Sequence, residues 1–253
     1  MMNVKLFFLS AVMLTAMFFA GCASVDEISE SDITVEMLEA KMAKKNDAAG
    51  LYRKSSGVLF RQVVKVPQLL DVDLETVLET KMIMPDKFRI TTLKENQPVQ
   101  VICSNGERGW IADLPGKKLH TLDGEQLQQL LTMARLSTPG AGYRTIFEKV
   151  EIFRCSNDDG EFYLLICSGK KDNKFRFYVD ADDFVLRRMC GKIKVGSGEL
   201  DYDSRIKSYG LYNGVMIPKV TETIQNGQKQ IIELLNYELN PAVSGNEFAP
   251  PVF

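Results

Sequence analysis

The single histidine of the chain limits the catalytic chemistry that this sequence could support. His120 is the only one in 253 residues. A Ser-His-Asp or Cys-His device, or a zinc site with a histidine ligand, would therefore have to use it. It lies between the turn signals Pro115-Gly116 and Asp123-Gly124, a position typical of an exposed hairpin residue. We therefore expect a protein that is not an enzyme.

Three further motifs bring polar groups together without completing a site. The acidic run from Asp180 to Asp183 lacks the spacing of a calcium-binding loop and is more typical of a turn cap. Asp201 and Asp203 would share one face of a strand, with no partner acid evident in the sequence. Gly196-Ser197-Gly198 is neither a nucleophile elbow nor a phosphate-binding loop. The sequence therefore predicts no metal and no cofactor.

The remaining thiols leave two interpretations open. Besides Cys22, the chain has Cys103, Cys155, Cys167 and Cys190. In an exported protein an even number of cysteines permits two disulfides in any of three connectivities, whereas free buried thiols are the simpler alternative. No two of these cysteines form a CxxC pair, so a zinc ribbon or a thioredoxin-type motif is not supported.

Cys22 has the most clearly predicted chemistry. It follows the almost wholly apolar stretch from Leu6 to Ala20, which is long enough for the core of a signal peptide and short for a bilayer span. The small residues Ala20 and Gly21 would let the chain lie extended in a peptidase cleft. The thiol that follows them can carry a thioether-linked diacylglycerol.

The residues around Cys22 resemble the lipobox of bacterial lipoproteins. Phe19 departs from the leucine that is usual at its place, and Ala23 resembles an outer-membrane address in enterobacteria-like sorting. We expect a lipoprotein signal peptide over residues 1–21, lipid attachment at Cys22 and a tether over residues 22–33. The alternatives are an ordinary signal peptide with a chance cysteine, or a retained transmembrane anchor.

Composition predicts one sizeable domain after the tether, over residues 34–253. The formal net charge is −2, and the sequence has no basic stripe or Lys/Arg-rich run. A nucleic-acid partner is therefore not expected.

Two segments are predicted to be helices. The first runs from about residue 34 to 45, because Thr34 can cap it and Val35, Leu38 and Met42 form an apolar stripe. The second begins at Asp123, continues with apolar residues at helical spacing over 127–134, and ends before residue 139.

Nearly all the rest of the domain alternates between apolar and polar residues and is broken by tight turns, among them Asn105-Gly106, Asn213-Gly214 and Asn226-Gly227. The expected strands cover residues 57–66, 76–84, 87–93, 99–103, 109–113, 145–155, 161–167, 174–180, 184–190, 203–209, 215–225 and 229–239. An antiparallel sheet of this length must curl, split or close. Its apolar face exceeds what two short helices can cover, so it either closes onto its own side chains or leaves a cavity for an apolar guest.

Several segments, taken in order, resemble the LolA/LolB superfamily of lipoprotein carriers and receptors. Residues 84–90, MPDKFRI, resemble its Pro-x-x-Phe-Arg strand start, and residues 104–113, SNGERGWIAD, resemble its glycine-tryptophan hairpin. Tyr178-Val179-Asp180 and the ending over residues 234–252 resemble two further family segments. The resemblance covers most of the mature chain. It implies a mainly β (α+β) fold, with a strongly curved antiparallel sheet, an unclosed β-barrel, and helices plugging the concave face.

The sequence departs from this family at one position. Soluble carriers of the family tend to have a basic residue just before the proline, where it closes a lid by pairing with helix backbone, whereas this chain has Met84. That departure and the lipid anchor favour a membrane-held acceptor or sensor over a freely diffusing shuttle.

These observations predict a cell-envelope lipoprotein, in the outer membrane facing the periplasm, that binds acyl chains or lipidated proteins in lipoprotein or lipid transport. Its partners would be those acyl chains, the membrane, and a periplasmic carrier protein. The alternatives are an envelope sensor and a structural lipoprotein that uses the same fold for protein contacts. The residues expected to line the cavity are Val58, Phe60, Met82, Phe88, Ile90, Trp110, Phe175 and Phe177, with Leu38 and Met42 of the first helix as a lid.

Overall fold

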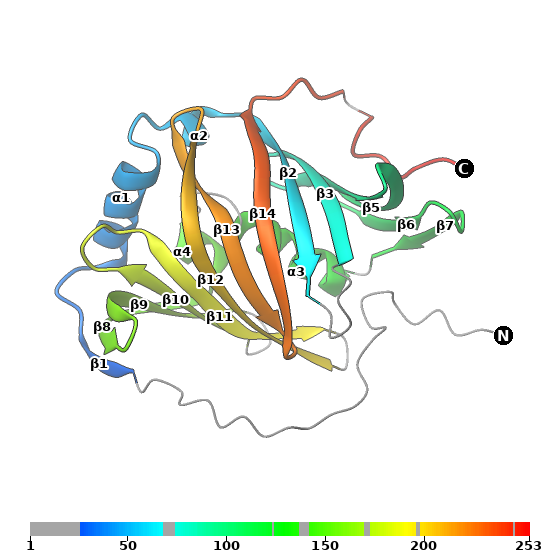
Figure 1. Cartoon of the computed structure of the whole chain (residues 1–253). Coiled ribbons are helices and arrows are strands. Elements are labelled where there is room, and N and C mark those ends of the chain that lie inside the picture. Colours follow the sequence, from blue (N-terminus) through cyan, green and yellow to red (C-terminus); the bar gives the residue numbers. More distant parts are fainter. Residues whose placement is uncertain are drawn as a thin grey trace.

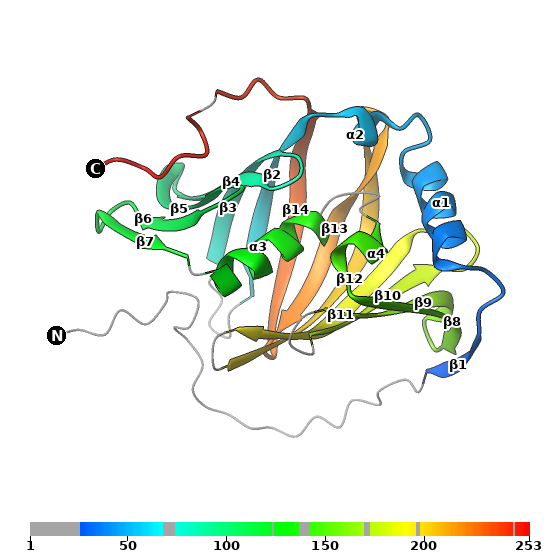
Figure 2. The ribbon, with the colours of Figure 1, turned by 180° about the vertical axis from the view of Figure 1, so that it is seen from behind.

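The computed structural model describes residues 26–67, 74–122, 124–136, 142–169, 173–195, 198–244 and 246–253. Its 14 strands form one antiparallel sheet in the order β1-β8-β9-β10-β11-β12-β13-β14-β2-β3-β4-β5-β6-β7. The sheet curves strongly and does not close, so that β1 and β7 are its two edges (Figure 1). Helices lie against its concave face (Figure 2). The predicted fold, a mainly β unclosed barrel with helices inside it, is confirmed.

The strands and helices have the following bounds. The strands are β1 (Glu27–Glu30), β2 (Gly57–Val66), β3 (Leu74–Ile83), β4 (Lys87–Lys94), β5 (Gln97–Asn105), β6 (Gly109–Asp113), β7 (Lys118–Thr121), β8 (Lys149–Asn157), β9 (Gly160–Ser168), β10 (Lys174–Asp180), β11 (Leu186–Val195), β12 (Gly198–Tyr212), β13 (Val215–Gln225) and β14 (Gln228–Leu239). The helices are α1 (Val35–Asn46), α2 (Leu51–Lys54), α3 (Gly124–Leu136) and α4 (Tyr143–Ile146). Among the described residues, no helix is both long enough and apolar enough to cross a membrane.

The sheet consists of two meanders joined by one long-range pairing. Strands β2 to β7 form one meander and β8 to β14 the other, and β14 pairs with β2. As a result β7 and β8, which are consecutive strands in the sequence, lie at opposite ends of the sheet. The chain between them must cross the concave side, and it does so as α3 and α4 (Figure 2).

Helix α1 begins where the sequence predicts it to begin. The Thr34 hydroxyl accepts a hydrogen bond from the Met37 amide at 3.3 Å, which satisfies one of the free N–H groups of the first turn. Val35 and Leu38 are buried against the sheet. The predicted second helix is α3, whose described part begins at Gly124, while Asp123 lies outside the described residues.

Two of the predicted Asn-Gly pairs form tight hairpin turns. Asn213-Gly214 and Asn226-Gly227 both have positive φ at each residue, which is the geometry of a type I′ turn. The turn between β4 and β5 has the same conformation at Glu95 and Asn96, with φ of 52° and 62°. Because that turn contains no glycine, its type I′ geometry could not be predicted from the sequence.

Four elements differ from the sequence prediction. Residues 145–148 were expected to be strand, but helix α4 occupies Tyr143–Ile146 and β8 begins only at Lys149. The α4 turn is held by a 2.6 Å hydrogen bond from the Tyr143 amide to the Glu39 carboxylate of α1, a contact that local sequence does not reveal. Strand β7 and helix α2 were not predicted. Residues Glu27–Glu30, assigned to the tether, instead form β1 and pair with β8.

The four cysteines outside the N-terminus are free thiols, so of the two open alternatives the structure has unpaired cysteines. Cys103, Cys155 and Cys167 are buried. Burial raises the pKa of Cys167 to about 12, with a further contribution from Glu39, and burial together with Asp26 raises the pKa of Cys155 to about 11. These thiols stay protonated at neutral pH and behave as small apolar side chains.

Candidate functional site

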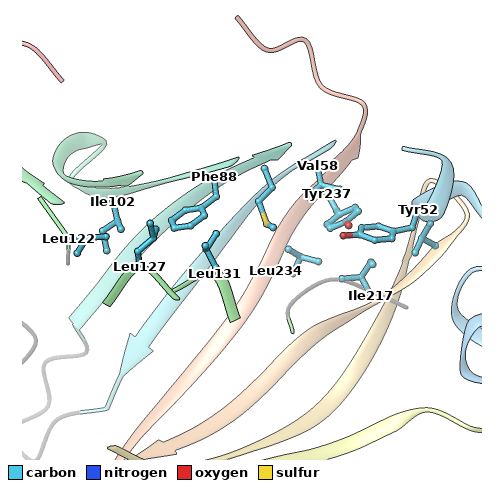
Figure 3. Close-up of a cluster of buried hydrophobic side chains, with 12 residues drawn as sticks. Tyr52, Val58, Phe88, Ile102, Leu122, Leu127, Leu131, Ile217, Leu234 and Tyr237 are labelled. Carbon is cyan, nitrogen blue, oxygen red and sulfur yellow. The ribbon is translucent and has the colours of Figure 1, made fainter. Parts of the chain in front are cut away.

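The concave face of the sheet carries two apolar clusters, which we name after the helices that cover them. The α3 cluster contains Tyr52, Val58, Met82, Phe88, Ile102, Leu122, Leu127, Leu131, Val215, Ile217, Leu234 and Tyr237 (Figure 3). The α1–α4 cluster contains Val35, Leu38, Tyr143, Phe147, Tyr163, Leu165, Cys167, Phe175, Phe177, Val179 and Tyr202. The pairing of β14 with β2 brings residues of both meanders into the α3 cluster.

Strand register explains why the α3 cluster is continuous. Directly paired residues of neighbouring strands point to the same face of a sheet. Val58 pairs with Met82, and Met82 pairs with Phe88, so these three side chains form one row across β2, β3 and β4. Phe88 is 1% exposed, because helix α3 lies over this row. Figure 3 shows Leu127 and Leu131 of α3 beside Phe88.

Helix α3 covers the cluster with aliphatic side chains. Its buried residues are Leu127 and Leu131. Gly109 of β6 allows the close approach, because a Cβ atom there would lie 2.9 Å from a methyl carbon of Leu127. Farther along the helix, Met133 and Leu136 pack against the α1–α4 cluster, so α3 touches both clusters.

A charged contact fastens the end of α3 to the sheet. The Nε atom of Arg135, in the last turn of α3, donates to Oδ1 of Asp86 at 3.1 Å. Asp86 lies in the turn between β3 and β4, two residues beyond Met84. This chain has Met84 where the family that it resembles tends to have a basic residue. Here the charges are the other way round: the cation, Arg135, lies on the helix and the carboxylate, Asp86, lies in the turn.

Tyrosines mark the end of the α3 cluster near α2. The Tyr52 hydroxyl contacts the sulfur of Met84 at 3.5 Å, and Phe60 and Tyr237 stack with ring centroids 6.0 Å apart. Burial raises the pKa of Tyr237, with further contributions from Tyr52 and Asp47. This hydroxyl therefore remains neutral. The buried Asp47 carboxylate beside Tyr52 is held by hydrogen bonds from the Leu51 and Tyr52 amides.

The structure divides the predicted cavity residues into three groups. Val58, Met82 and Phe88 belong to the α3 cluster, with Phe60 and Ile90 half-buried against it. Phe175, Phe177 and Leu38 belong to the α1–α4 cluster, and Met42 packs beside it. Helix α1 therefore covers the α1–α4 cluster and not the row of Val58, Met82 and Phe88. Trp110 packs with Val101, Cys103 and Ala112 on the convex face, so its placement in the cavity was wrong.

Sequence reasoning did not include several members of the α3 cluster. Tyr52 lies on the unpredicted helix α2, and Leu234 and Tyr237 join through the pairing of β14 with β2. Leu127 and Leu131 were recognised as part of an apolar stripe on a helix. The length of that stripe was the sequence signal that this helix would pack against the sheet.

The convex face has a polar cleft of about 380 Å³ beside the C-terminal segment. Its lining consists of Glu79, Lys81, Arg89, Thr91, Ser244, Asn246 and Glu247. Lys81 pairs with Glu247 at 2.8 Å, and Arg89 donates to the Glu247 backbone carbonyl at 3.1 Å. These charged groups fasten the C-terminal segment to the sheet.

The described residues do not assemble a metal-binding group. His120 lies on the exposed edge strand β7. Within the parts of the chain that the structure describes, no three His, Cys, Asp or Glu side chains are grouped so that they could hold a metal ion. The dominant feature of this molecule is therefore the covered apolar concave face.

A half-open antiparallel sheet with helices across its concave face is the LolA fold, and solved structures confirm this. A LolA superfamily protein from Nitrosomonas europaea matches with a TM-score of 0.59 at 13% identity, over 86% of this chain and 98% of that one. A putative outer membrane lipoprotein-sorting protein domain from Vibrio parahaemolyticus matches with a TM-score of 0.56 at 10% identity, over 85% and 95% of the two chains.

A DUF1329 family protein from Desulfovibrio piger has a similar fold, with a TM-score of 0.57 at 9% identity over 85% of this chain and 96% of that one. No family model matches the sequence. No curated protein matches it either. The chain therefore has a LolA-like fold, and at these identities the likeness concerns the fold alone.

Proposed function

We propose that this chain is a cell-envelope lipoprotein that binds acyl chains, free or attached to a lipidated protein, between helix α3 and the sheet, without catalysis. The observation that carries the proposal is the aliphatic plug that α3 inserts into the α3 cluster. Leu127 and Leu131 are chemically close to a segment of acyl chain, so hydrocarbon can replace them with little change in the groups that are buried.

The driving force for such an exchange is the transfer of methylene groups out of water. Each buried CH₂ group contributes about 0.8 kcal/mol. Because Phe88 is nearly inaccessible beside Leu127 and Leu131 of α3, a ligand would reach it only when α3 moves away. The ion pair between Arg135 and Asp86 then acts as the fastener that opens.

The cellular setting is also part of the proposal. Cys22 would carry the lipid anchor, a few residues before β1, and would hold the domain at the outer membrane facing the periplasm. A membrane-held acceptor requires a donor, so the expected partner is a periplasmic carrier of acyl chains. One structural neighbour is titled a putative outer membrane lipoprotein-sorting protein domain, which supports lipoprotein or lipid transport as the process.

The acyl-binding proposal can be tested with a charge placed on the concave face. Ile90 is half-buried beside the α3 cluster, so Ile90→Glu should abolish saturable uptake of a fluorescent fatty acid, since a buried unpaired carboxylate is costly. Leu211→Glu is the matched control, because Leu211 is 76% exposed and its variant should bind like the wild type. Circular dichroism would verify that both variants fold. A wild type without saturable uptake would overturn the proposal.

The anchor has its own test. Cys22→Ala should move the protein from the membrane fraction to the soluble fraction, because a diacyl or triacyl anchor holds firmly. Unchanged membrane association would exclude lipidation of Cys22 as its cause.

The second candidate is a sensor or structural lipoprotein that uses the same fold for protein contacts. The observation that favours it is the dense filling of the concave face, where Leu38 and Leu165 are completely inaccessible to solvent. A wild type that takes up no acyl probe, together with an Ile90→Glu variant that unfolds, would favour this second candidate.

A further inference from the structure

The open sheet leaves two edge strands of opposite charge. In the described chain β1 pairs only with β8, and β7 pairs only with β6. All four residues of each strand are exposed. Strand β1 carries Glu27 and Glu30, whereas β7 carries Lys118 and His120 and follows directly on Lys117. Figure 1 shows the two edges on opposite sides of the molecule.

The two edges also have matching faces. Ile28 pairs with Cys155, which belongs to the convex cluster of Phe162, Leu164 and Tyr178. Leu119 pairs with Ala112, which is likewise on the convex face. Ile28 is 47% exposed and Leu119 is 42% exposed, so each edge presents one apolar side chain to solvent on the same face.

These facts define one antiparallel alignment between two molecules. Placing Ile28 opposite Leu119 keeps both side chains on the convex face. It also sets Glu30 opposite Lys117, Ser29 opposite Lys118 and Glu27 opposite His120. Directly opposed pairs of opposite charge and apolar pairs both stabilise antiparallel strands.

We propose that the β1 edge of one molecule pairs with the β7 edge of a second copy of this chain. The contact is head-to-tail, since two different surfaces meet, and each added copy leaves one acidic and one basic edge free. The concave faces of successive copies then lie on the same side of a continued sheet. This inference does not depend on acyl binding.

Charges on edge strands usually protect them against pairing. Here the charges prevent pairing between identical edges, because two β1 strands or two β7 strands would repel each other. The same charges favour pairing of a β1 edge with a β7 edge. The interface spans only four residues on each side, so association should be weak, should depend on concentration and should weaken as salt is added.

The test is co-capture between two differently tagged preparations of the full chain in a mild detergent. Wild type should capture wild type. Glu27→Lys/Glu30→Lys has two basic edges and should capture itself at least about tenfold less, since like charges face each other. Lys117→Glu/Lys118→Glu has two acidic edges and should show the same loss. Mixing the two variants should restore capture.

The matched control is Glu95→Lys/Glu238→Lys, which makes the same change in net charge at exposed positions on neither edge strand. It should capture itself like the wild type. Loss of capture in this control would show that net charge, and not the edge pairing, governs association, and would overturn the proposal.

A positional test uses cysteines. Because Cys155 lies directly opposite Ile28 on β8, the test uses a Cys155→Ala background. In it, Ile28→Cys mixed with Leu119→Cys should give an intermolecular disulfide on mild oxidation, above the background of Cys155→Ala alone, whereas each cysteine variant alone should not. Self-capture that is absent from the wild type, or that survives both charge reversals, would overturn the proposal. Cross-linking of either cysteine variant with itself would do the same.

Discussion

The two halves of the concave face are filled by different kinds of side chain. The α1–α4 cluster is aromatic, and Phe177 lies 4.8 Å from Tyr143 and 5.8 Å from Phe147 between ring centroids. Its helices are also tied to each other and to the sheet. Glu39 of α1 accepts a hydrogen bond from the Tyr143 amide of α4, and Lys41 lies 4.4 Å above the ring of Phe184.

The α3 cluster is closed by leucines of one helix and by the contact between Arg135 and Asp86. Interlocking aromatic rings from two helices and a sheet are not easily replaced by a ligand. Leucine side chains that fill a space can be replaced by a hydrocarbon chain of similar chemistry. The comparison teaches that similar burial can serve two purposes. Under the acyl-binding proposal, the α1–α4 cluster would be the fixed core of the domain, and the α3 cluster would be the half that a guest enters.

The largest effect should come from truncating an aromatic residue of the fixed half. Phe177→Ala should lower the free energy of unfolding by about 3–5 kcal/mol, because the cavity it leaves is enclosed on all sides. Leu131→Ala in the α3 cluster should cost roughly 2 kcal/mol, the low end for such truncations, because α3 can settle into the gap. Urea unfolding of both variants measures the difference, and a larger loss for Leu131→Ala would break the comparison.

An intermediate effect is expected from the fastener of α3. Asp86→Asn should speed uptake of an acyl probe while changing the free energy of unfolding by less than about 1 kcal/mol, since both partners are partly exposed. Glu36→Gln is the matched control, because Glu36 forms a similar ion pair with Arg144 at 2.8 Å on the fixed half. Stopped-flow fluorescence should show faster uptake for Asp86→Asn alone. Equal rates in all three proteins would contradict the assignment.

The smallest effect concerns the edge of the fixed half at low pH. Burial opposes ionisation of Asp26, but hydrogen bonds from Asn157 and Tyr178 and the nearby Arg176 outweigh it and lower its pKa below 3.8. A lowered folded-state pKa means that ionised Asp26 stabilises the fold above that pH, and that this contribution disappears as pH falls through the folded value.

Amide hydrogen exchange in β1 should therefore rise as the pH falls below about 4, after correction for the intrinsic pH dependence of exchange. Exchange in β7 should lack this additional rise. Asp26→Asn should raise β1 exchange at neutral pH and remove its extra acid dependence. A wild type whose β1 and β7 respond identically to acid would contradict the role of Asp26.

Local features of the chain could be predicted from the sequence because their causes are local. Alternation placed Val58 and Phe60 on one face, and Thr34 capped its helix. The turns at Asn213-Gly214 and Asn226-Gly227 formed as their type requires, whereas at Asn105-Gly106 only the glycine has a positive φ. Trp110 could have been placed correctly by the same rule, since Gly109 and Ile111 face α3 and the residue between them must face away.

Other features have causes that lie far away in the sequence. Leu38 and Met42 of helix α1 were expected to be the lid of one cavity lined by both Phe88 and Phe177. They lie only over the cluster of Phe177, because the pairing of β14 with β2 decides which strands lie beneath each helix. Strand β1 has the polar sequence EISE and owes its conformation to its pairing with β8. In that pairing Ile28 lies opposite Cys155, which is 127 residues later in the sequence (155 − 28).

The pairing of β14 with β2 also has a consequence for how the chain folds. Each meander is built from neighbouring hairpins and can form as soon as its own strands are available. The seam between them aligns Leu239 with Val58 and needs the last strand of the chain. Pairings between such distant segments form slowly, because the entropy cost of closing a long loop must be met before any contact stabilises the pairing. Until β14 docks, β2 and β13 each expose an unpaired edge, so the folding chain is most vulnerable to aggregation before this pairing forms.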